Sequence, residues 1–394
     1  MKNLAIWVGL TLCGCASDGG SAETRGSAET HGSTPHDPIN ATVGALDDVV
    51  AAGPPGAMLY RSRPNEMSYG SSGRAATNSN SLPDLYDRWR IASVTKPFVA
   101  TVVLRLVEQG VLELDAAVER YVPGLLPASM PITLRQLLNH TSGLADYHDF
   151  DGLESAADFD ARRLDAPSAR DRIALAVERS PVAKPGAEYH YTDTNYRVLE
   201  VVLETATGEK LGALLDEHII EPLQLSDTSF PSDETISGPH LHGYMPSDLA
   251  DEPFADQAHL IDYTEQTVDQ TGGAGALISS ASDIDTFYRA LLGGKLLSAP
   301  MLREMQRTVP VDEDSEALGT TGSGLGIESW DLGCGEVWGH GGSTRGYTTL
   351  TFASADANAE GEGATLVLVI TQDPLPPAAY EPTLRAVNLG WCGK

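Results

Sequence analysis

The chain has 394 residues, 41% of them hydrophobic, so it is long enough to bury a sizeable core and to form roughly two to three domains. Its 55 acidic and 26 basic residues give a formal net charge of −29, and the chain has no basic run. This charge argues against nucleic acid and anionic lipid headgroups as partners, because both would be repelled.

The N-terminal segment has the features of an export signal. Lys2 precedes an apolar run over residues 4–12, which is too short to span a bilayer. The run ends in Leu12-Cys13-Gly14-Cys15, which resembles a bacterial lipoprotein signal over residues 1–15 with Cys15 as the lipidated residue, although Cys13 replaces the usual small residue. An ordinary secretory signal is the alternative. Both predict an exported protein. The lipoprotein signal further predicts a location in the bacterial cell envelope, with a lipid anchor as the only membrane contact.

Residues 16–38 contain a near-repeat of Gly-Ser-Ala-Glu-Thr with almost no apolar side chains, which predicts a flexible tether before a folded region over 39–394. Once Cys13 is removed and Cys15 is acylated, Cys334 and Cys392 remain as an even pair in an oxidising compartment. We expect a disulfide between them, with two buried thiols as the alternative.

The order of helix and strand patterns predicts an α/β fold with an all-α insertion. The α/β part covers about 39–110 and 270–394, and the helical insertion about 111–269. Helices are expected at 43–50, 93–110, 133–138, 168–177, 196–205, 282–292 and 384–389. Strands are expected at 57–60, 89–91, 275–279, 324–327, 336–340, 347–353 and 365–371.

Ser93 and Lys96 form the only Ser-x-x-Lys in the chain. If a helix begins at Ser93, both side chains lie on one face of its first turn, so the hydroxyl lies beside an amine that can take its proton. The positive end of the helix dipole also favours a developing anion there. The pattern predicts an activated serine nucleophile, with a serine cap and a solvated lysine as the alternative.

Further stretches give this pattern its context. They are Tyr191-Thr192-Asp193, Leu137-Leu138-Asn139-His140-Thr141-Ser142-Gly143-Leu144, Trp338-Gly339-His340-Gly341-Gly342-Ser343 and Asp331-Leu332-Gly333-Cys334-Gly335. With these, the chain from about residue 45 onward resembles the serine β-lactamase and penicillin-binding superfamily, in the branch of class C β-lactamases and Streptomyces-type D-alanyl-D-alanine carboxypeptidases. The resemblance implies a β-lactamase/DD-peptidase-like α/β fold, with an antiparallel sheet flanked by helices.

The resemblance also implies a role for each matching residue. Ser93 would attack a carbonyl and become acylated, Lys96 would help remove its proton, and Tyr191 would act as general acid and base with the lysine. His340 stands where β-lactamases carry a lysine and would help to move a proton or polarise Tyr191. A capped surface tyrosine and a histidine that only packs are the alternatives for these two positions.

The same resemblance places the substrate along residues 340–345. The backbone N–H groups of Ser93 and Ser343 would form the oxyanion hole, and Gly341 and Gly342 would let the substrate backbone lie close to the strand. Asp193 stands where the family usually carries an asparagine, which changes a hydrogen-bond donor into an acceptor and should alter how a peptide is positioned.

Two further departures concern specificity. Related carboxypeptidases carry an arginine-rich stretch before the cysteine that holds the substrate carboxylate, whereas this chain has Ile327-Glu328-Ser329-Trp330. Arg345 could replace that cation, with a solvated loop arginine as the alternative. Residues 269–273 also lack the tryptophan of the carboxypeptidase, which predicts a different side-chain pocket.

The sequence therefore predicts an exported serine hydrolase that acts through an acyl-enzyme. A D-Ala-D-Ala carboxypeptidase-like activity on peptidoglycan-type peptides is the first expectation. An esterase, a class C-like β-lactamase and a non-catalytic penicillin-binding sensor are the alternatives. The expected partners are a small peptide, ester or β-lactam substrate and no nucleic acid. We expect no cofactor and no metal, and the sequence gives no oligomeric state.

Overall fold

The computed structural model describes residues 38–150, 155–247, 259–317, 319–358 and 362–393. The expected signal with Cys15, and residues 16–37 of the expected tether, lie outside the described residues. Within the described ranges, no helix is both long and apolar enough to cross a membrane.

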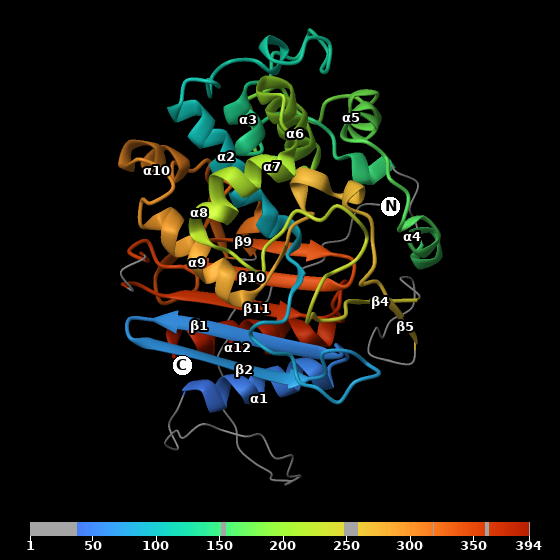
Figure 1. The fold of residues 1–394 in the computed structure, drawn as a ribbon, viewed down its shortest axis with the longest axis vertical. Coiled ribbons are helices and arrows are strands. Elements are labelled where there is room, and N and C mark those ends of the chain that lie inside the picture. Colours follow the sequence, from blue (N-terminus) through green and yellow to red (C-terminus); the bar gives the residue numbers. More distant parts are fainter. Residues whose placement is uncertain (1–37, 151–154, 248–258, 318, 359–361, 394) are drawn as a thin grey trace.

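The centre of the fold is an antiparallel sheet built from both ends of the chain (Figure 1). Within the described part of the chain it has seven strands in the order β2-β1-β11-β10-β9-β8-β7. Their bounds are β1 Gly56–Arg63, β2 Glu66–Gly73, β7 Thr320–Ser323, β8 Glu328–Asp331, β9 Glu336–Thr344, β10 Tyr347–Ala353 and β11 Thr365–Ile370. Two short strand pairs lie outside it, β3 Trp89–Arg90 with β6 Ile278–Ser279 and β4 Tyr244–Pro246 with β5 Leu260–Asp262.

Helices cover both faces of this sheet. α1 Pro38–Ala51 and α12 Tyr380–Cys392 pack together on one face, while α9 Ala281–Leu292 packs against β11 on the other (Figure 1). Alternate residues of β1 therefore enter two different cores, since Met58 packs on the α9 side and Leu59 on the α1 side. This explains the consecutive apolar residues at 57–60 in β1 and 366–370 in β11, as expected for strands buried on both faces.

In Figure 1 the helical region lies above β9, at the end of the sheet opposite β1 and β2. Its helices are α2 Thr95–Glu108, α3 Leu134–Leu138, α4 Ala156–Arg162, α5 Ala169–Val177, α6 Thr194–Thr207, α7 Leu211–Leu215, a π-helical turn at Asp216–Ile220 and α8 Glu221–Leu223. Two further helices, α10 Ala299–Met305 and α11 Glu313–Ala317, follow α9.

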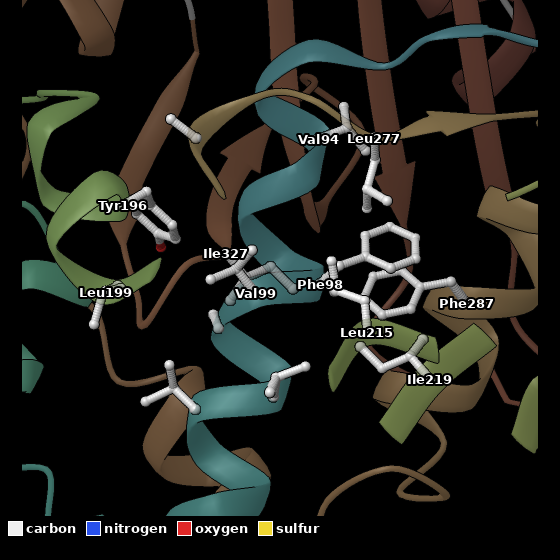
Figure 2. Packing of buried hydrophobic residues seen from close by; sticks show 14 of the residues in the cluster. Val94, Phe98, Val99, Tyr196, Leu199, Leu215, Ile219, Leu277, Phe287 and Ile327 are labelled. Carbon is white, nitrogen blue, oxygen red and sulfur yellow. The ribbon is translucent and has the colours of Figure 1, made fainter. Parts of the chain in front are cut away.

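α2 is the packing centre of the helical region. Its side chains contact α6 on one side and α9 on the other, and Phe98 stacks on Phe287 with ring centroids 3.6 Å apart (Figure 2). Nearly every residue of α2 is buried. The segment that carries Ser93 and Lys96 is thus anchored on a rigid element rather than on a mobile loop.

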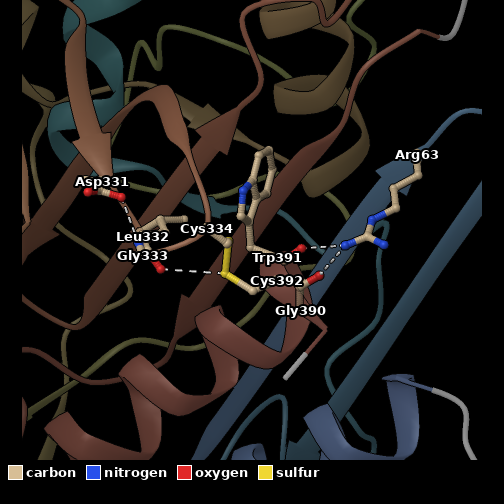
Figure 3. The surroundings of a disulfide bond; sticks show 8 residues. All are labelled: Arg63, Asp331, Leu332, Gly333, Cys334, Gly390, Trp391 and Cys392. Atoms are coloured by element: carbon tan, nitrogen blue, oxygen red, sulfur yellow. Dashed lines mark hydrogen bonds between the residues drawn. A yellow bond between two sulfur atoms is a disulfide. The ribbon is translucent and has the colours of Figure 1, made fainter. Parts of the chain in front are cut away.

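A disulfide joins Cys334, in the turn between β8 and β9, to Cys392 at the end of α12 (Figure 3). Beside it, the Arg63 guanidinium donates a hydrogen bond to the carbonyl oxygen of Trp391 at 2.5 Å. The structure thus joins the two cysteines that the sequence pairs. In the chain-entropy model, a loop with a sequence separation of 58 residues gives a stabilisation of roughly 4 kcal/mol.

The predicted α/β class, the antiparallel sheet and the helical middle of the chain are confirmed, with three corrections. The strand expected at 324–327 is the turn between β7 and β8, closed by a hydrogen bond from the Gly324 N–H to the Ile327 carbonyl oxygen at 2.8 Å. Leu325 and Ile327 are buried because this turn packs into the main core, which gave the segment its strand-like composition. The middle region also contains β4 and β5, and the helix expected from residue 93 begins at Thr95.

Candidate active site

Ser93 lies in a single 3-10 turn, Ala92–Val94, immediately before α2. Ala92 has a φ of 53°, a left-handed conformation that is costly for an L-residue and typical of strained functional turns. β9 runs directly against this turn, and Gly342 makes the approach possible, since a Cβ there would lie 2.5 Å from the Ile91 carbonyl oxygen. The turn thus holds the partly exposed Ser93 beside β9.

Lys96 is fully buried, and its amine hydrogen-bonds to two oxygens and forms an ion pair with a third. Nζ lies 2.7 Å from Ser93 Oγ, 2.8 Å from the Ala274 carbonyl oxygen and 2.7 Å from Asp193 Oδ1. The carbonyl and the carboxylate can only accept. When the amine is neutral, two N–H groups therefore remain committed to them and the lone pair faces the serine hydroxyl. This is the orientation that a general base for Ser93 needs.

Tyr191 approaches Ser93 from the segment that precedes α6. Its Oη lies 3.0 Å from Ser93 Oγ, and its ring stacks on His140 with centroids 4.3 Å apart. His140 Nδ1 accepts hydrogen bonds from the Thr192 N–H and from the Asn195 amide, so the Leu-Leu-Asn-His-Thr-Ser-Gly stretch positions the tyrosine. Burial, followed by the charge of Asp193, raises the pKa of Tyr191 well above its usual range, so the resting tyrosine carries its proton.

Asp193, at the N-terminal end of α6, pairs with two potential cations. Oδ1 lies 2.7 Å from Lys96 Nζ and Oδ2 lies 3.2 Å from His148 Nε2. Burial alone would raise the pKa of Asp193, but the Lys96 and His148 partners lower it well below its ordinary value. The residue that departs from the family pattern is therefore a buried, ionised carboxylate in direct contact with the lysine.

His340 lies on β9 beside Tyr191, with ring centroids 6.3 Å apart. Its Nδ1 lies 2.5 Å from the Gly341 carbonyl oxygen, which can only accept, so Nδ1 carries a proton. Burial lowers the pKa of His340, which keeps the ring neutral and leaves Nε2 as an acceptor. Glu328 Oε1 lies 4.0 Å from Nε2. Glu328 Oε1 and His340 Nε2 are therefore two acceptors that face each other.

The predicted substrate strand lies where the sequence expects it, with Gly341, Gly342 and Ser343 on β9. Ser343 Oγ donates to Asp373 Oδ1 at 2.5 Å, so it joins β9 to the segment that follows β11. Arg345 lies in the turn after β9, with its guanidinium carbon 3.6 Å from the centre of the Phe159 ring. The oxyanion hole at the Ser93 and Ser343 N–H groups and an anion-binding role for Arg345 stay predictions.

Three contributors to the site were not found from the sequence. His148 and Asp146 come from the loop after α3, and Asp373 follows β11. Their local sequences carry no pattern that marks them, and only the fold brings them to the site. Within the described ranges, no group of three or more His, Cys, Asp or Glu residues is arranged to hold a metal ion.

The assembled residues suit acyl transfer. A hydroxyl lies within hydrogen-bond distance of an amine and a phenol, and strand and turn backbones converge beside it. Attack by Ser93 Oγ on a carbonyl carbon would transfer the hydroxyl proton to Lys96, and Tyr191 can protonate the leaving group. Water would then release the acyl group from Ser93.

Comparisons with known proteins agree with this chemistry. Residues 44–389 match the family model described as Beta-lactamase. The fold is similar to the crystal structure of a D-stereospecific amidohydrolase from Streptomyces sp. (TM-score 0.78, 32% identity, 90% of this chain and 99% of that one). It is also similar to a D-amino acid amidase from Ochrobactrum anthropi (TM-score 0.76, 27% identity, 89% of this chain and 98% of that one).

Among curated proteins, Esterase EstB of Burkholderia gladioli is 37% identical over 193 residues, which are 45% of this chain and 48% of the esterase. The chain spans about half the length of the curated relatives it matches, with 46% and 51% for the next two. The family match covers most of the chain, and its relatives include an esterase and amide hydrolases. The chain therefore belongs to the beta-lactamase family, within the serine β-lactamase and penicillin-binding superfamily, and is a serine hydrolase.

Proposed function

We propose that the protein hydrolyses small amides of D-amino acids whose amino group is free and positively charged, through an acyl-enzyme on Ser93. Such substrates include D-amino-acid amides and peptides with an N-terminal D-residue. The observation that carries the proposal is the carboxylate of Glu328 beside His340, where a carboxypeptidase would need a cation.

The charge at this position favours an ammonium group. The Glu328 side chain is 12% exposed, and no Lys or Arg among the described residues lies within 4.0 Å of its carboxylate. Glu328 Oε1 and His340 Nε2 are both acceptors, 4.0 Å apart. A substrate ammonium has three N–H donors and can bond to both groups, whereas a substrate carboxylate has no donor and meets a like charge.

The similar structures support the same substrate class. Their names describe a D-stereospecific amidohydrolase and a D-amino acid amidase, and the second is in complex with L-phenylalanine amide, a compound with a free amino group. Arg345, the cation expected to hold a carboxylate, has its guanidinium stacked on Phe159. These points favour an amidase or aminopeptidase over the D-Ala-D-Ala carboxypeptidase that the sequence first suggests.

An esterase is the second candidate, because of the similarity to Esterase EstB over 193 residues. It would prefer short neutral esters and would not depend on a substrate amine. Both candidates would act through the same acyl-enzyme on Ser93. They differ only in which substrate group is recognised beside Ser93.

The test compares D-phenylalanine amide with its N-acetyl derivative, its L-enantiomer and N-acyl-D-Ala-D-Ala. We expect the free-amine D-amide to be hydrolysed at least 100-fold more efficiently than the other three, and Ser93→Ala to abolish the reaction. Glu328→Gln keeps the side-chain shape but removes the charge. We expect it to raise KM for the free-amine amide at least tenfold and to change KM for the N-acetyl amide less than threefold.

Glu336→Gln, an exposed change at the start of β9, is the matched control and should leave both KM values unchanged. Release of terminal D-Ala from N-acyl-D-Ala-D-Ala would instead establish the carboxypeptidase. Preference for neutral esters would establish the esterase, and rapid opening of a chromogenic cephalosporin the β-lactamase. A lasting penicillin adduct without turnover of any substrate would indicate a sensor.

A further inference from the structure

The resting arrangement of Lys96 raises a question of proton balance. The Asp193 carboxylate in contact with Nζ stabilises the charged form of the amine, and this form cannot take the proton of Ser93. Tyr191 cannot substitute as a base because it also carries its proton. Before Ser93 can attack, one proton must leave Lys96.

We propose that His148, acting through Asp193, is the residue that takes up this charge, so that His148 is a positioning residue for the general base Lys96. His148 Nε2 faces the Asp193 carboxylate, which can only accept, so this nitrogen already carries a proton. In the net step, Lys96 loses one proton, the His148 ring gains one from solvent and becomes a cation, and Asp193 remains an anion. The total charge of the three groups is unchanged, and the carboxylate always faces one cation.

The contacts support this exchange. Lys96 at 2.7 Å and His148 at 3.2 Å are the two potential cations within 4.0 Å of Asp193 among the described residues, and they contact different oxygens of its carboxylate. Lys96 is fully buried, whereas the His148 side chain is 17% exposed and can exchange protons with solvent. A charge moved from Lys96 to His148 therefore moves from the interior toward water, where solvation stabilises it.

Asp146 fixes the geometry of the exchange. Its Oδ2 accepts the N–H of Asp193 and its Oδ1 accepts the N–H of His148, each at 3.0 Å, so one side chain ties the loop to the end of α6. Its charge also favours a cation at His148. Further titratable or charged groups around these residues, within the described ranges, include Tyr147, Tyr191, Tyr196, His140, His340 and Glu328, with Arg172 and Arg197 beside Tyr147.

This arrangement follows from the departure in the tyrosine motif. A neutral asparagine at position 193 would not hold Lys96 in its charged form and would not need a second cation. An aspartate does both, so the structure couples position 193 to position 148. This coupling is the quantity that the experiment measures.

The test measures acylation of Ser93 from the p-nitrophenolate burst with p-nitrophenyl acetate, between pH 5 and 10. The ester carries no amine and no chiral centre, so the result is independent of the substrate proposed above. The variants are His148→Gln, Asp193→Asn and the double variant. His242→Gln is the matched control, since His242 Nδ1 contacts Asp262 Oδ2 at 2.7 Å in another His–Asp pair.

We expect His148→Gln to slow acylation at least tenfold at pH 7 and to move the acid limb of the profile up by one pH unit or more. Acylation should recover to within threefold of wild type at pH 10, because high pH favours proton removal without help from His148. In the Asp193→Asn background, His148→Gln should change acylation less than threefold at every pH. His242→Gln should match wild type throughout.

Equal losses in both backgrounds would mean that His148 only supports the loop, and the proposal would be wrong. A loss that is the same at every pH would also overturn it, as would no loss at all. If Asp193→Asn is inactive or does not fold, the pH profile of His148→Gln alone decides, because a structural defect does not recover at high pH.

Discussion

Ser93 Oγ lies between an amine at 2.7 Å and a phenol at 3.0 Å, and the two neighbours have different roles. Lys96 directs a lone pair at the hydroxyl when it is neutral. Tyr191 has a raised pKa because it is buried and close to Asp193, so it remains a proton donor near neutral pH. At the scale of single residues, Lys96 is therefore suited to be the base for attack and Tyr191 the acid for the leaving group.

Changing Tyr191→Phe removes that acid but keeps the ring that stacks on His140. We expect kcat/KM for an amide to fall by roughly 10²- to 10³-fold, the usual contribution of a positioned general acid. The loss should be smaller for a p-nitrophenyl ester, whose leaving group needs no proton. Steady-state kinetics on the two substrates measure the difference.

Tyr60→Phe is the control for this variant. Tyr60 is also buried, and its Oη donates a hydrogen bond to Asp285 Oδ2 at 3.1 Å. It should lose about 1 kcal/mol of stability with kcat/KM unchanged. Equal losses on amide and ester for Tyr191→Phe would contradict the role of Tyr191 as the acid for the leaving group.

At the scale of elements, the site depends on how closely β9 lies against the turn before α2. A Cβ at position 342 would lie 2.5 Å from the Ile91 carbonyl oxygen and 3.2 Å from Ala92 Cβ. The first contact is with backbone, which cannot rotate away as a side chain can. Gly342 therefore sets the distance between Ser93 and the strand that is predicted to align the substrate.

We expect Gly342→Ala to displace this turn, to reduce kcat at least tenfold and to lower the free energy of unfolding by about 1–3 kcal/mol, the usual cost of overpacking. Kinetics and urea unfolding measure the two effects. Gly44→Ala is the control, because a Cβ at this position in α1 meets no atom within 4 Å. An active Gly342→Ala enzyme of wild-type stability would show that the strand can move away without consequence.

The sequence predicted those elements and site residues that a pattern within one continuous segment marks. Ser93, Lys96 and Tyr191 each belong to a short motif, and the structure brings them together. His148 contacts Asp193 across 45 residues, a pairing that depends on where the loop after α3 packs. The strand expected at 324–327 was wrong because burial of a turn gives the same apolar composition as burial of a strand.

At the scale of the whole molecule, the net charge of −29 means that acidic groups decide how stability varies with pH. Asp373 is the clearest case, because burial raises its pKa to about 7, although the hydroxyls of Ser343 and Thr348 partly offset the effect. The native state therefore holds this proton more tightly than the unfolded chain, where the carboxyl ionises near its ordinary value of 3.8.

This difference fixes the sign of the pH dependence. Between pH 4 and pH 7 the unfolded chain releases the Asp373 proton first, so the free energy of unfolding falls as the pH rises through this window. Above pH 7 both states are ionised and the contribution is constant. Stability falls between pH 4 and pH 7 because the pKa of Asp373 is raised. Asp193 has the opposite effect, because its lowered pKa stabilises the fold above pH 4.

Asp373→Asn should remove this slope, since an amide oxygen can still accept the Ser343 hydroxyl but carries no charge. We expect the variant to gain about 2–4 kcal/mol relative to wild type between pH 5 and pH 8, measured by urea unfolding at each pH. Asp356→Asn, at an exposed position, removes the same charge from the total. If both variants shift stability equally, the effect belongs to net charge. If only Asp373→Asn raises stability, the cause is the burial of a carboxyl beside the predicted oxyanion strand, which lowers stability at neutral pH. Such a cost is expected where a site is selected for its chemistry rather than for stability.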